Sequence, residues 1–115
     1  MSDVRIEREQ TETTVTIASS GTQSTAIPTG AAVKGSFLIP SGLTGDTIAY
    51  EVSNDGGNTW SALYRDGGTA VAAITVTSLK GKIIPLPIEV FSSQVARIVS
   101  GSAEGAERSI VVFVS

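Results

Sequence analysis

The stretch that decides the fold is TIAYEVSNDGGNTW, residues 47–60. Its first half alternates, because Ile48, Tyr50 and Val52 are separated by residues that are polar or small. An alternation of period two puts the two sets of side chains on opposite faces of a β-strand, so we predict a half-buried strand over residues 47–53. The second half contains Asp-Gly-Gly-Asn, which is the turn chemistry of a β-hairpin.

The hairpin segment SNDGGNTW has further recognisable features. Its two glycines permit positive φ, its aspartate can accept backbone N–H groups inside the turn, and its tryptophan ring can cover the base of the hairpin. The structural residues of this hairpin are expected to be Ser53, Asp55, Gly56, Gly57, Thr59 and Trp60. The pattern S-x-D-x-G-x-T-W also matches the Asp-box, a hairpin motif that recurs in sialidase-type propellers. A propeller needs one copy in each blade, and this chain holds one copy, so the match favours a structural turn over a sugar-contacting site.

Short strands are predicted on both sides of this hairpin, because Val, Ile and Thr are abundant and Gly and Ser clusters follow every eight to twelve residues. The predicted strands cover residues 13–18, 33–39, 47–53, 60–64, 70–77, 82–88, 95–99 and 109–114. Pro85 and Pro87 limit the segment 82–88 to an edge strand or an extended segment. A short helical turn is expected over residues 87–93, and no window of twelve residues has the apolar stripe of a long helix.

Seven or eight strands bury their apolar faces by forming two packed sheets or a closed barrel. We therefore predict an all-β fold, an antiparallel β-sandwich, with a jelly-roll as the narrower alternative. Residues 13–115 are expected to form this single domain. Residues 1–12 carry six charges in twelve positions and are expected to form an N-terminal arm or tail.

The composition excludes several classes of chemistry. The chain has 115 residues, of which 28 are Ser or Thr, and it has no Cys and no His. A disulfide framework, a Cys/His zinc site, a thiol nucleophile and a histidine base are therefore ruled out. The net charge of -3 and the scarcity of Lys and Arg argue against nucleic-acid binding, and no apolar run is long enough for a membrane helix.

No catalytic or metal-binding motif is recognisable. Asp55 and Asp66 each precede a Gly pair, but a calcium loop needs several carboxylates at alternate positions, so turn formation is the better interpretation. Five further candidate acids lie in no motif for paired-carboxylate chemistry: Asp46, Glu51, Glu89, Glu104 and Glu107. We predict no enzyme activity, no cofactor and no metal.

The last strand suggests a contact with another molecule. Five consecutive apolar residues, 110–114, imply burial on both faces, either between sheets or at a subunit contact. The other four aromatic residues are expected in the core, so Trp60 and Tyr64 are the aromatic candidates for contacts at the surface. The candidate interaction surface therefore comprises Arg5, Arg8, Trp60, Tyr64, Val112 and Val114.

The succession PSGLTGDTIAYEVSNDGGNTWSALYRDGG, residues 40–68, resembles a family of small virion proteins of tailed bacteriophages. The order of an apolar strand, T-G, an alternating strand, V-S-x-D-G-G-x-T-[WY] and L-Y carries the resemblance. It continues more loosely through Phe91 and the segment RIVSG at 97–101, and the segment ASSGTQST at 18–25 resembles the family's entry segment. Together these features cover roughly residues 15–114.

The resemblance implies a non-enzymatic β-sandwich built into a phage particle and located in the virion after assembly in the host cytoplasm. Such domains decorate capsids as cement proteins, usually as trimers bound to the major capsid protein, and similar domains occur in tails, baseplates and fibre adaptors. We therefore expect self-association and a virion protein as partner, with no nucleic acid or membrane. A carbohydrate-binding module remains a second alternative, because Trp60 and Tyr64 are close in sequence to the Asp-box.

Overall fold

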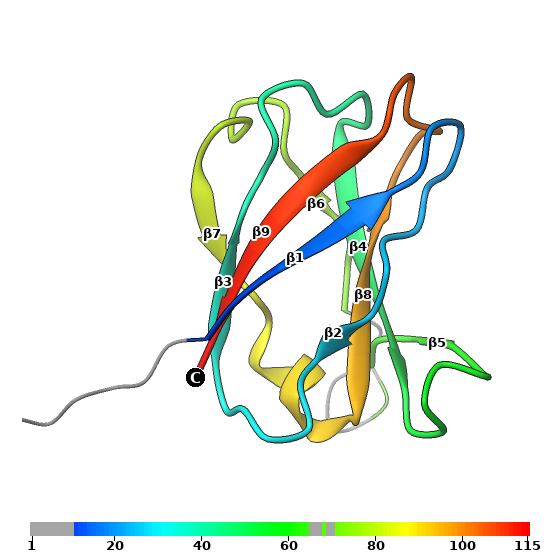
Figure 1. Ribbon diagram of the computed structural model, residues 1–115, viewed down its shortest axis with the longest axis vertical. Helices are drawn as coiled ribbons and strands as arrows, with labels where there is room; N and C mark the ends of the chain where they lie inside the picture. The colour runs from blue at the N-terminus through cyan, green and yellow to red at the C-terminus, as the bar shows by residue number, and fades with distance from the viewer. Residues whose placement is uncertain (1–10, 65–67, 69–70) are drawn as a thin grey trace, which may run out of the picture.

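The computed structural model describes residues 11–64, 68 and 71–115, which form two facing antiparallel sheets (Figure 1). The first sheet has the order β1-β9-β3-β7. Its strands are β1 (Thr11–Ile17), β9 (Arg108–Val114), β3 (Gly35–Leu38) and β7 (Ile83–Pro85). The first and last strands of the described chain are thus neighbours, paired over their full length from Thr11–Val114 to Ile17–Arg108.

The second sheet has the order β2-β8-β4-β5, and β6 also pairs with β4. Its strands are β2 (Ile27–Pro28), β8 (Val95–Ser100), β4 (Thr47–Ser53), β5 (Ser61–Ala62) and β6 (Ile74–Thr75). A 3-10 helix, η1 (Ile88–Ser92), lies before β8 and buries Val90. The central pair of this sheet is β4 with β8, whose register runs from Ile48–Ser100 to Ser53–Val95.

The core lies between the two sheets and is built from alternate residues of the long strands. The fully buried aliphatic side chains include Val15 and Ile17 on β1, Ile48 on β4, Ile98 on β8, and Ile110 and Val112 on β9. Phe37 and Tyr50 connect the sheets, with their ring centroids 6.2 Å apart and their planes at 82°, an edge-to-face contact. The alternation that the sequence shows therefore becomes the inside and the outside of a sandwich.

The predicted fold class, an all-β antiparallel sandwich, is confirmed, and the jelly-roll remains a prediction. The strand predicted over 47–53 has the same bounds in the structure. Three predicted strands are much shorter: only Ser61–Ala62 of the segment 60–64, Ile74–Thr75 of the segment 70–77 and Ile83–Pro85 of the segment 82–88 are in strands. The first strand begins at Thr11, so Thr11 and Glu12 of the expected arm pair with β9. The rest of that arm, residues 1–10, lies outside the described residues.

The final strand, β9, corrects one expectation. Ile110, Val112 and Val114 face the core and are at most 6% exposed, whereas Val111 and Phe113 are half-buried on the outer face. Val112 and Val114 therefore do not belong to a surface, and their assignment to the interaction surface was wrong. The residues that face inward could not be identified from the sequence, because all five residues at 110–114 are apolar and no polar residue marks the outer face of the strand. Within a single chain, β9 is buried on one face.

Candidate functional site

The hairpin after β4 is held together by the carboxylate of Asp55. The hydroxyl of Ser53 donates to Asp55 Oδ1 at 2.6 Å, the backbone N–H of Thr59 donates to the same oxygen at 2.9 Å, and the Thr59 hydroxyl donates to Oδ2. The N–H of Gly57 donates back to Ser53 Oγ at 3.0 Å. Gly56 and Gly57 have φ of +74° and +95°, conformations that a residue with a Cβ rarely adopts. Four of the six predicted hairpin residues, Ser53, Asp55, Gly57 and Thr59, thus form one hydrogen-bonded unit.

The pKa of the Asp55 carboxyl group is lowered in the folded protein. Hydrogen bonds from Ser53 first, and then from Thr59, lower the pKa of Asp55 from 3.8 to about 2. Donors that bind the ionised form stabilise it, so the turn geometry accounts for the shift.

Two contacts fix this hairpin to the start of β8. The N–H of Gly56 donates to Gln94 Oε1 at 2.7 Å, and the N–H of Gln94 donates to Asn54 Oδ1 at 2.8 Å. Sequence reasoning missed Gln94, because its partners are about forty residues away and the pattern around it has no turn motif. The hairpin is therefore a rigid end of the second sheet.

Trp60 lies against a paired charge on the outer face of the second sheet. Arg97 Cζ is 4.2 Å from the centroid of the Trp60 ring, a cation–π distance. Glu51, which is directly opposite Arg97 in the β4–β8 register, accepts from Arg97 Nη2 at 2.6 Å and from Nε at 2.7 Å. This two-point ion pair orients the guanidinium, so one part of the aromatic surface is already covered by the protein's own side chain.

The structure separates the members of the predicted interaction surface. Trp60 is half-buried beside Arg97, Tyr64 is 55% exposed, and Val112 and Val114 are inside the core. Arg5 and Arg8 lie outside the described residues, as do Asp66 and Gly67 of the second predicted turn. The cluster that the structure assembles is therefore Glu51, Arg97 and Trp60.

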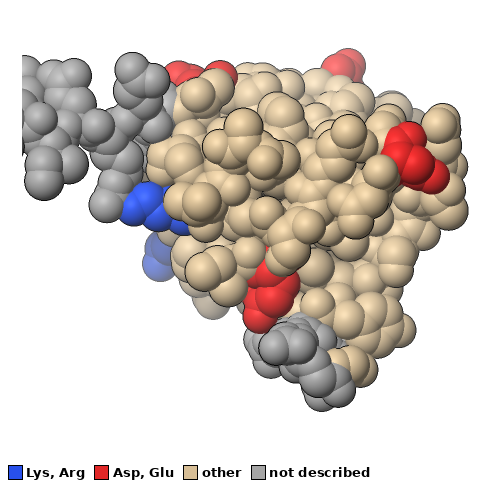
Figure 2. Space-filling model, turned by 90° about the horizontal axis from the view of Figure 1, so that it is seen from below, with Lys and Arg blue, Asp and Glu red and all other residues tan. Residues whose placement is uncertain are grey.

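Four of the acidic residues that the sequence offered for catalysis have structural partners in the described part of the chain. Asp46 pairs with Lys80, Glu51 with Arg97, Asp55 with Ser53 and Thr59, and Glu104 with Arg108. Among residues 11–64, 68 and 71–115, no three His, Cys, Asp or Glu side chains converge as a metal site would require. On the end of the molecule shown in Figure 2, uncharged side chains form most of the surface and acidic side chains stand apart from one another.

Replacing Asp55 by Ala is expected to lower the melting temperature at pH 7 by a few degrees. It should also make the melting temperature fall less between pH 7 and pH 2. The pKa of Asp55 is lower in the folded protein than in the unfolded chain, so its ionised form stabilises the fold above about pH 4. This contribution is lost as the pH falls toward 2. Circular dichroism melts from pH 7 to pH 2 measure both effects. Asp46→Ala, which removes an exposed carboxylate 3.4 Å from Lys80 Nζ, is the control and should leave both nearly unchanged. An Asp55→Ala protein that melts like the wild type would contradict the role of Asp55.

No helix in the described residues is long and apolar enough to cross a membrane. The chain matches no known family model, no curated protein and no solved structure.

Proposed function

We propose that the protein is a structural component of a tailed-phage particle, a decoration protein that self-associates, as a trimer, and binds the major capsid protein. The observation that carries the proposal is the edge of β1, where the outward backbone groups of Glu12 and Thr14 have no neighbouring strand in the described part of the chain and can pair with a strand from another chain. The resemblance of residues 40–68 to virion proteins supports the same role. A tail, baseplate or fibre-adaptor position is the alternative within the particle.

The backbone of β1 offers hydrogen-bonding groups on its outer side. At one end of the strand, the N–H of Thr16 donates to Thr25 Oγ1 at 3.1 Å and the C=O of Thr16 accepts from the N–H of Thr25 at 2.9 Å. These groups point away from β9. Because backbone groups of a paired antiparallel strand alternate in direction, the N–H and C=O of Glu12 and Thr14 point the same way. No strand in the described part of the chain lies beside them.

The other sheet edges in the described residues are blocked or short. On β7, the N–H of Leu86 turns toward β3 and donates to the C=O of Gly35 at 2.9 Å, so the adjacent outward position is Pro85, which has no N–H. The strand β2 has two residues and ends in Pro28, and β5 and β6 also have two residues each. Proline and short length are the usual protections of sheet edges. The edge of β1 has neither, which favours it as an attachment edge for strand addition.

A carbohydrate-binding role receives less support from the hairpin. Stacking on a sugar needs an open aromatic face, and Arg97 lies 4.2 Å above the Trp60 ring, held there by Glu51. Fluorescence quenching of Trp60 by host-surface glycans is the test that would favour this alternative.

Particles prepared without this protein provide the main experiment. We expect them to lose resistance to heat and to chelators, and to regain it when the wild-type protein is added back. Thr14→Pro removes one outward N–H and should lower occupancy on the particle at least about tenfold, since a strand addition depends on each backbone hydrogen bond. Thr14→Val keeps that N–H and is the matched control, expected to bind like the wild type.

Three outcomes separate the hypotheses. Unchanged resistance of the deficient particles would refute the cementing role. Wild-type binding by Thr14→Pro would refute the use of the β1 edge. A mass-spectrometric count in purified particles distinguishes the two locations, because hundreds of copies favour the capsid and a few to a few dozen favour the tail.

A further inference from the structure

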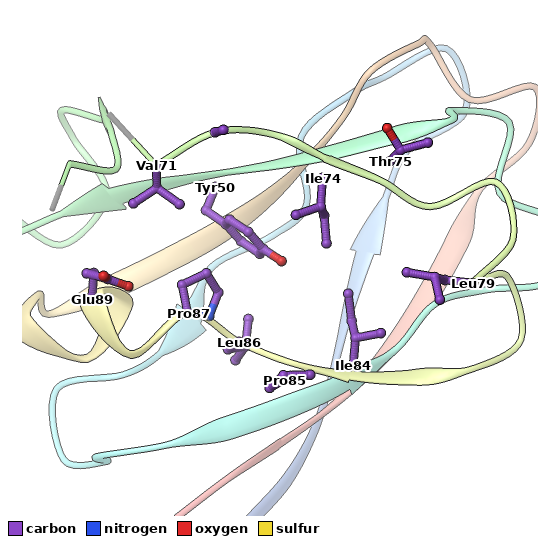
Figure 3. A pocket seen from close by; sticks show the side chains of 11 residues that line it. Tyr50, Val71, Ile74, Thr75, Leu79, Ile84, Pro85, Leu86, Pro87 and Glu89 are labelled. Atoms are coloured by element: carbon purple, nitrogen blue, oxygen red, sulfur yellow. The ribbon is translucent and has the colours of Figure 1, made fainter. Parts of the chain in front are cut away.

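A groove opens between the two sheets on the side away from β1. It has a volume of about 620 Å³ and lies between β6 of the second sheet and β7 of the first (Figure 3). Its walls are mostly aliphatic, and the main apolar lining residues are Val71, Ile74, Leu79, Ile84 and Leu86. A volume of this size is within the range of small-molecule sites.

Tyr50 supplies a polar group at the base of this groove. The residue is only 5% exposed, and its hydroxyl points into the space between Ile74, Leu79 and Ile84 (Figure 3). No described residue forms a hydrogen bond with that hydroxyl, and the described residues contain no unpartnered polar side-chain atom that is sealed from solvent, so the hydroxyl is open to the groove. Burial raises the pKa of Tyr50, so the hydroxyl stays neutral and can both donate and accept.

We propose that this groove binds a small uncharged molecule that has an apolar body and one hydroxyl or carbonyl oxygen, which forms a hydrogen bond with Tyr50. The apolar body would cover the aliphatic walls, and its oxygen would form a hydrogen bond with the Tyr50 hydroxyl, which has no partner among the described residues. A charged group would lose its hydration against this mostly apolar lining, and an anion would also meet the carboxylate of Glu89, the one charged residue among the described residues that line the groove, so charged ligands, and anions above all, are disfavoured. This site lies apart from the β1 edge and does not depend on the proposed role in a virion.

Cyclohexanol is a suitable probe, because it has one hydroxyl on a compact aliphatic ring. A titration of the isotope-labelled full chain, followed by amide chemical shifts, should show saturable changes at residues 71–75 and 79–87 with a dissociation constant on the order of 1 mM. Cyclohexanecarboxylate at pH 7 has the same ring with a negative charge and should bind at least about tenfold more weakly.

Tyr50→Phe removes the hydroxyl and keeps the ring that packs on Phe37, so the fold should be retained. It should weaken cyclohexanol binding roughly three- to tenfold, the effect of one hydrogen bond. Tyr64→Phe makes the same chemical change on the other tyrosine, which is 55% exposed and outside the groove, and should leave binding unchanged. Leu79→Trp places a larger side chain where Leu79 points into the groove (Figure 3) and should abolish the shifts.

Each arm of this experiment has an outcome that overturns the proposal. Shifts that do not saturate, or that lie away from the groove, would refute the site. Equal affinity of Tyr50→Phe and the wild type would refute the hydrogen bond. Carboxylate binding as tight as that of the alcohol would refute the preference for an uncharged ligand. Because the assays use the isolated chain, failure here leaves the particle experiments unaffected, and the reverse also holds.

Discussion

Glu104→Ala is expected to reduce the free energy of unfolding by about 2–6 kcal/mol, because it leaves two backbone N–H groups without their acceptor, each at a cost of about 1–3 kcal/mol. The side chain of Glu104 is completely buried and the residue is 1% exposed. Small domains have a total stability of about 5–15 kcal/mol, so this single change should remove a large part of it. Urea unfolding followed by circular dichroism is the measurement.

The expected cost comes from the groups that Glu104 satisfies. Its Oε1 accepts from the N–H of Thr44 at 2.8 Å and from Arg108 Nε at 3.0 Å. Its Oε2 accepts from the hydroxyl of Ser100 at 2.8 Å and from the N–H of Gly45 at 3.1 Å. Arg108 is 23% exposed and can turn to water when the carboxylate is lost. The two backbone N–H groups cannot do so without moving the loop, and each unsatisfied donor costs about 1–3 kcal/mol.

Glu104 also fixes three separate segments of the chain to one another. Its backbone C=O accepts from Ser20 at 2.7 Å, and its N–H donates to Gly21 at 2.9 Å. The loop after β1, the loop before β4 and the loop before β9 therefore converge on this one residue. The substitution is expected to loosen that end of the sandwich first, which amide hydrogen exchange at Thr44 and Gly45 would detect.

The pH dependence of stability should follow from the same contacts. Burial alone would raise the pKa of Glu104, but hydrogen bonds from Thr44, Ser100, Arg108 and Gly45 outweigh it, and the pKa is lowered. A carboxyl with a lower pKa in the folded state stabilises the fold above its unfolded pKa of about 4.3 and loses that contribution as the pH falls through the folded value. The wild type should therefore lose stability below about pH 4 more steeply than Glu104→Ala.

Glu107→Ala is the matched control, because Glu107 is an exposed acid three residues away in the same segment. It should change the free energy of unfolding by less than about 0.5 kcal/mol. If Glu104→Ala were as mild as Glu107→Ala, the buried carboxylate would be dispensable and its hydrogen bonds would not stabilise the fold.

Local patterns predicted part of this structure. The alternation at residues 47–53 predicted the bounds of β4, because Ile48 and Tyr50 are buried while their neighbours Ala49 and Glu51 are only partly buried. The Asp-Gly-Gly sequence predicted the hairpin, since its hydrogen bonds lie within eight residues. The two-residue strand β2 has one buried aliphatic residue, Ile27, and offered no periodicity from which to predict it.

The rest depends on contacts that are distant in the chain. Glu104 is sixty residues from Thr44, and Arg97 is forty-six residues from Glu51, so neither pair can be found without the strand register. The groove at Tyr50 forms only when two sheets pack, and the alternation of β4 indicates that Tyr50 is inside without showing that its hydroxyl has no partner. Local patterns therefore predict the long strands, whereas the short strands and the functional candidates depend on the packing of the two sheets.

Gly35→Ala is the second substitution with a large expected effect on stability. Backbone propensity predicts that it stabilises the protein, whereas the steric contacts at this position predict that it destabilises it. Glycine within a strand is unfavourable for the backbone, so propensity alone predicts that alanine stabilises by roughly 0.5–1 kcal/mol. In the structure, a Cβ at position 35 would lie 2.5 Å from the backbone oxygen of Phe113 and 3.1 Å from Val114 Cγ1. The first contact is with backbone, which cannot yield as a flexible side chain can.

Relief of that contact would push β3 away from β9. The two strands pair over Gly35–Val114, Ser36–Phe113 and Phe37–Val112, so a shift at one end disturbs a short register of three pairs. Leu86 Cδ1, 3.2 Å from the added carbon, blocks movement on the other side, where β7 is paired. We expect a loss of about 3 kcal/mol, at the upper end of overpacking effects.

Gly105→Ala is the control that distinguishes the steric contact at position 35 from the general effect of replacing glycine by alanine. The nearest atom to a Cβ at position 105 is Thr44 Oγ1, at 3.8 Å, which is an ordinary contact distance. Its stability should be unchanged or slightly higher, while that of Gly35→Ala falls, when both are measured by urea unfolding. Because β1 pairs with β9 along its full length, Gly35→Ala should also reduce the protection of the β1 amides against hydrogen exchange. If Gly35→Ala were as stable as the wild type, the first sheet would have room at this position, and the close approach of β3 to β9 would not constrain the sandwich.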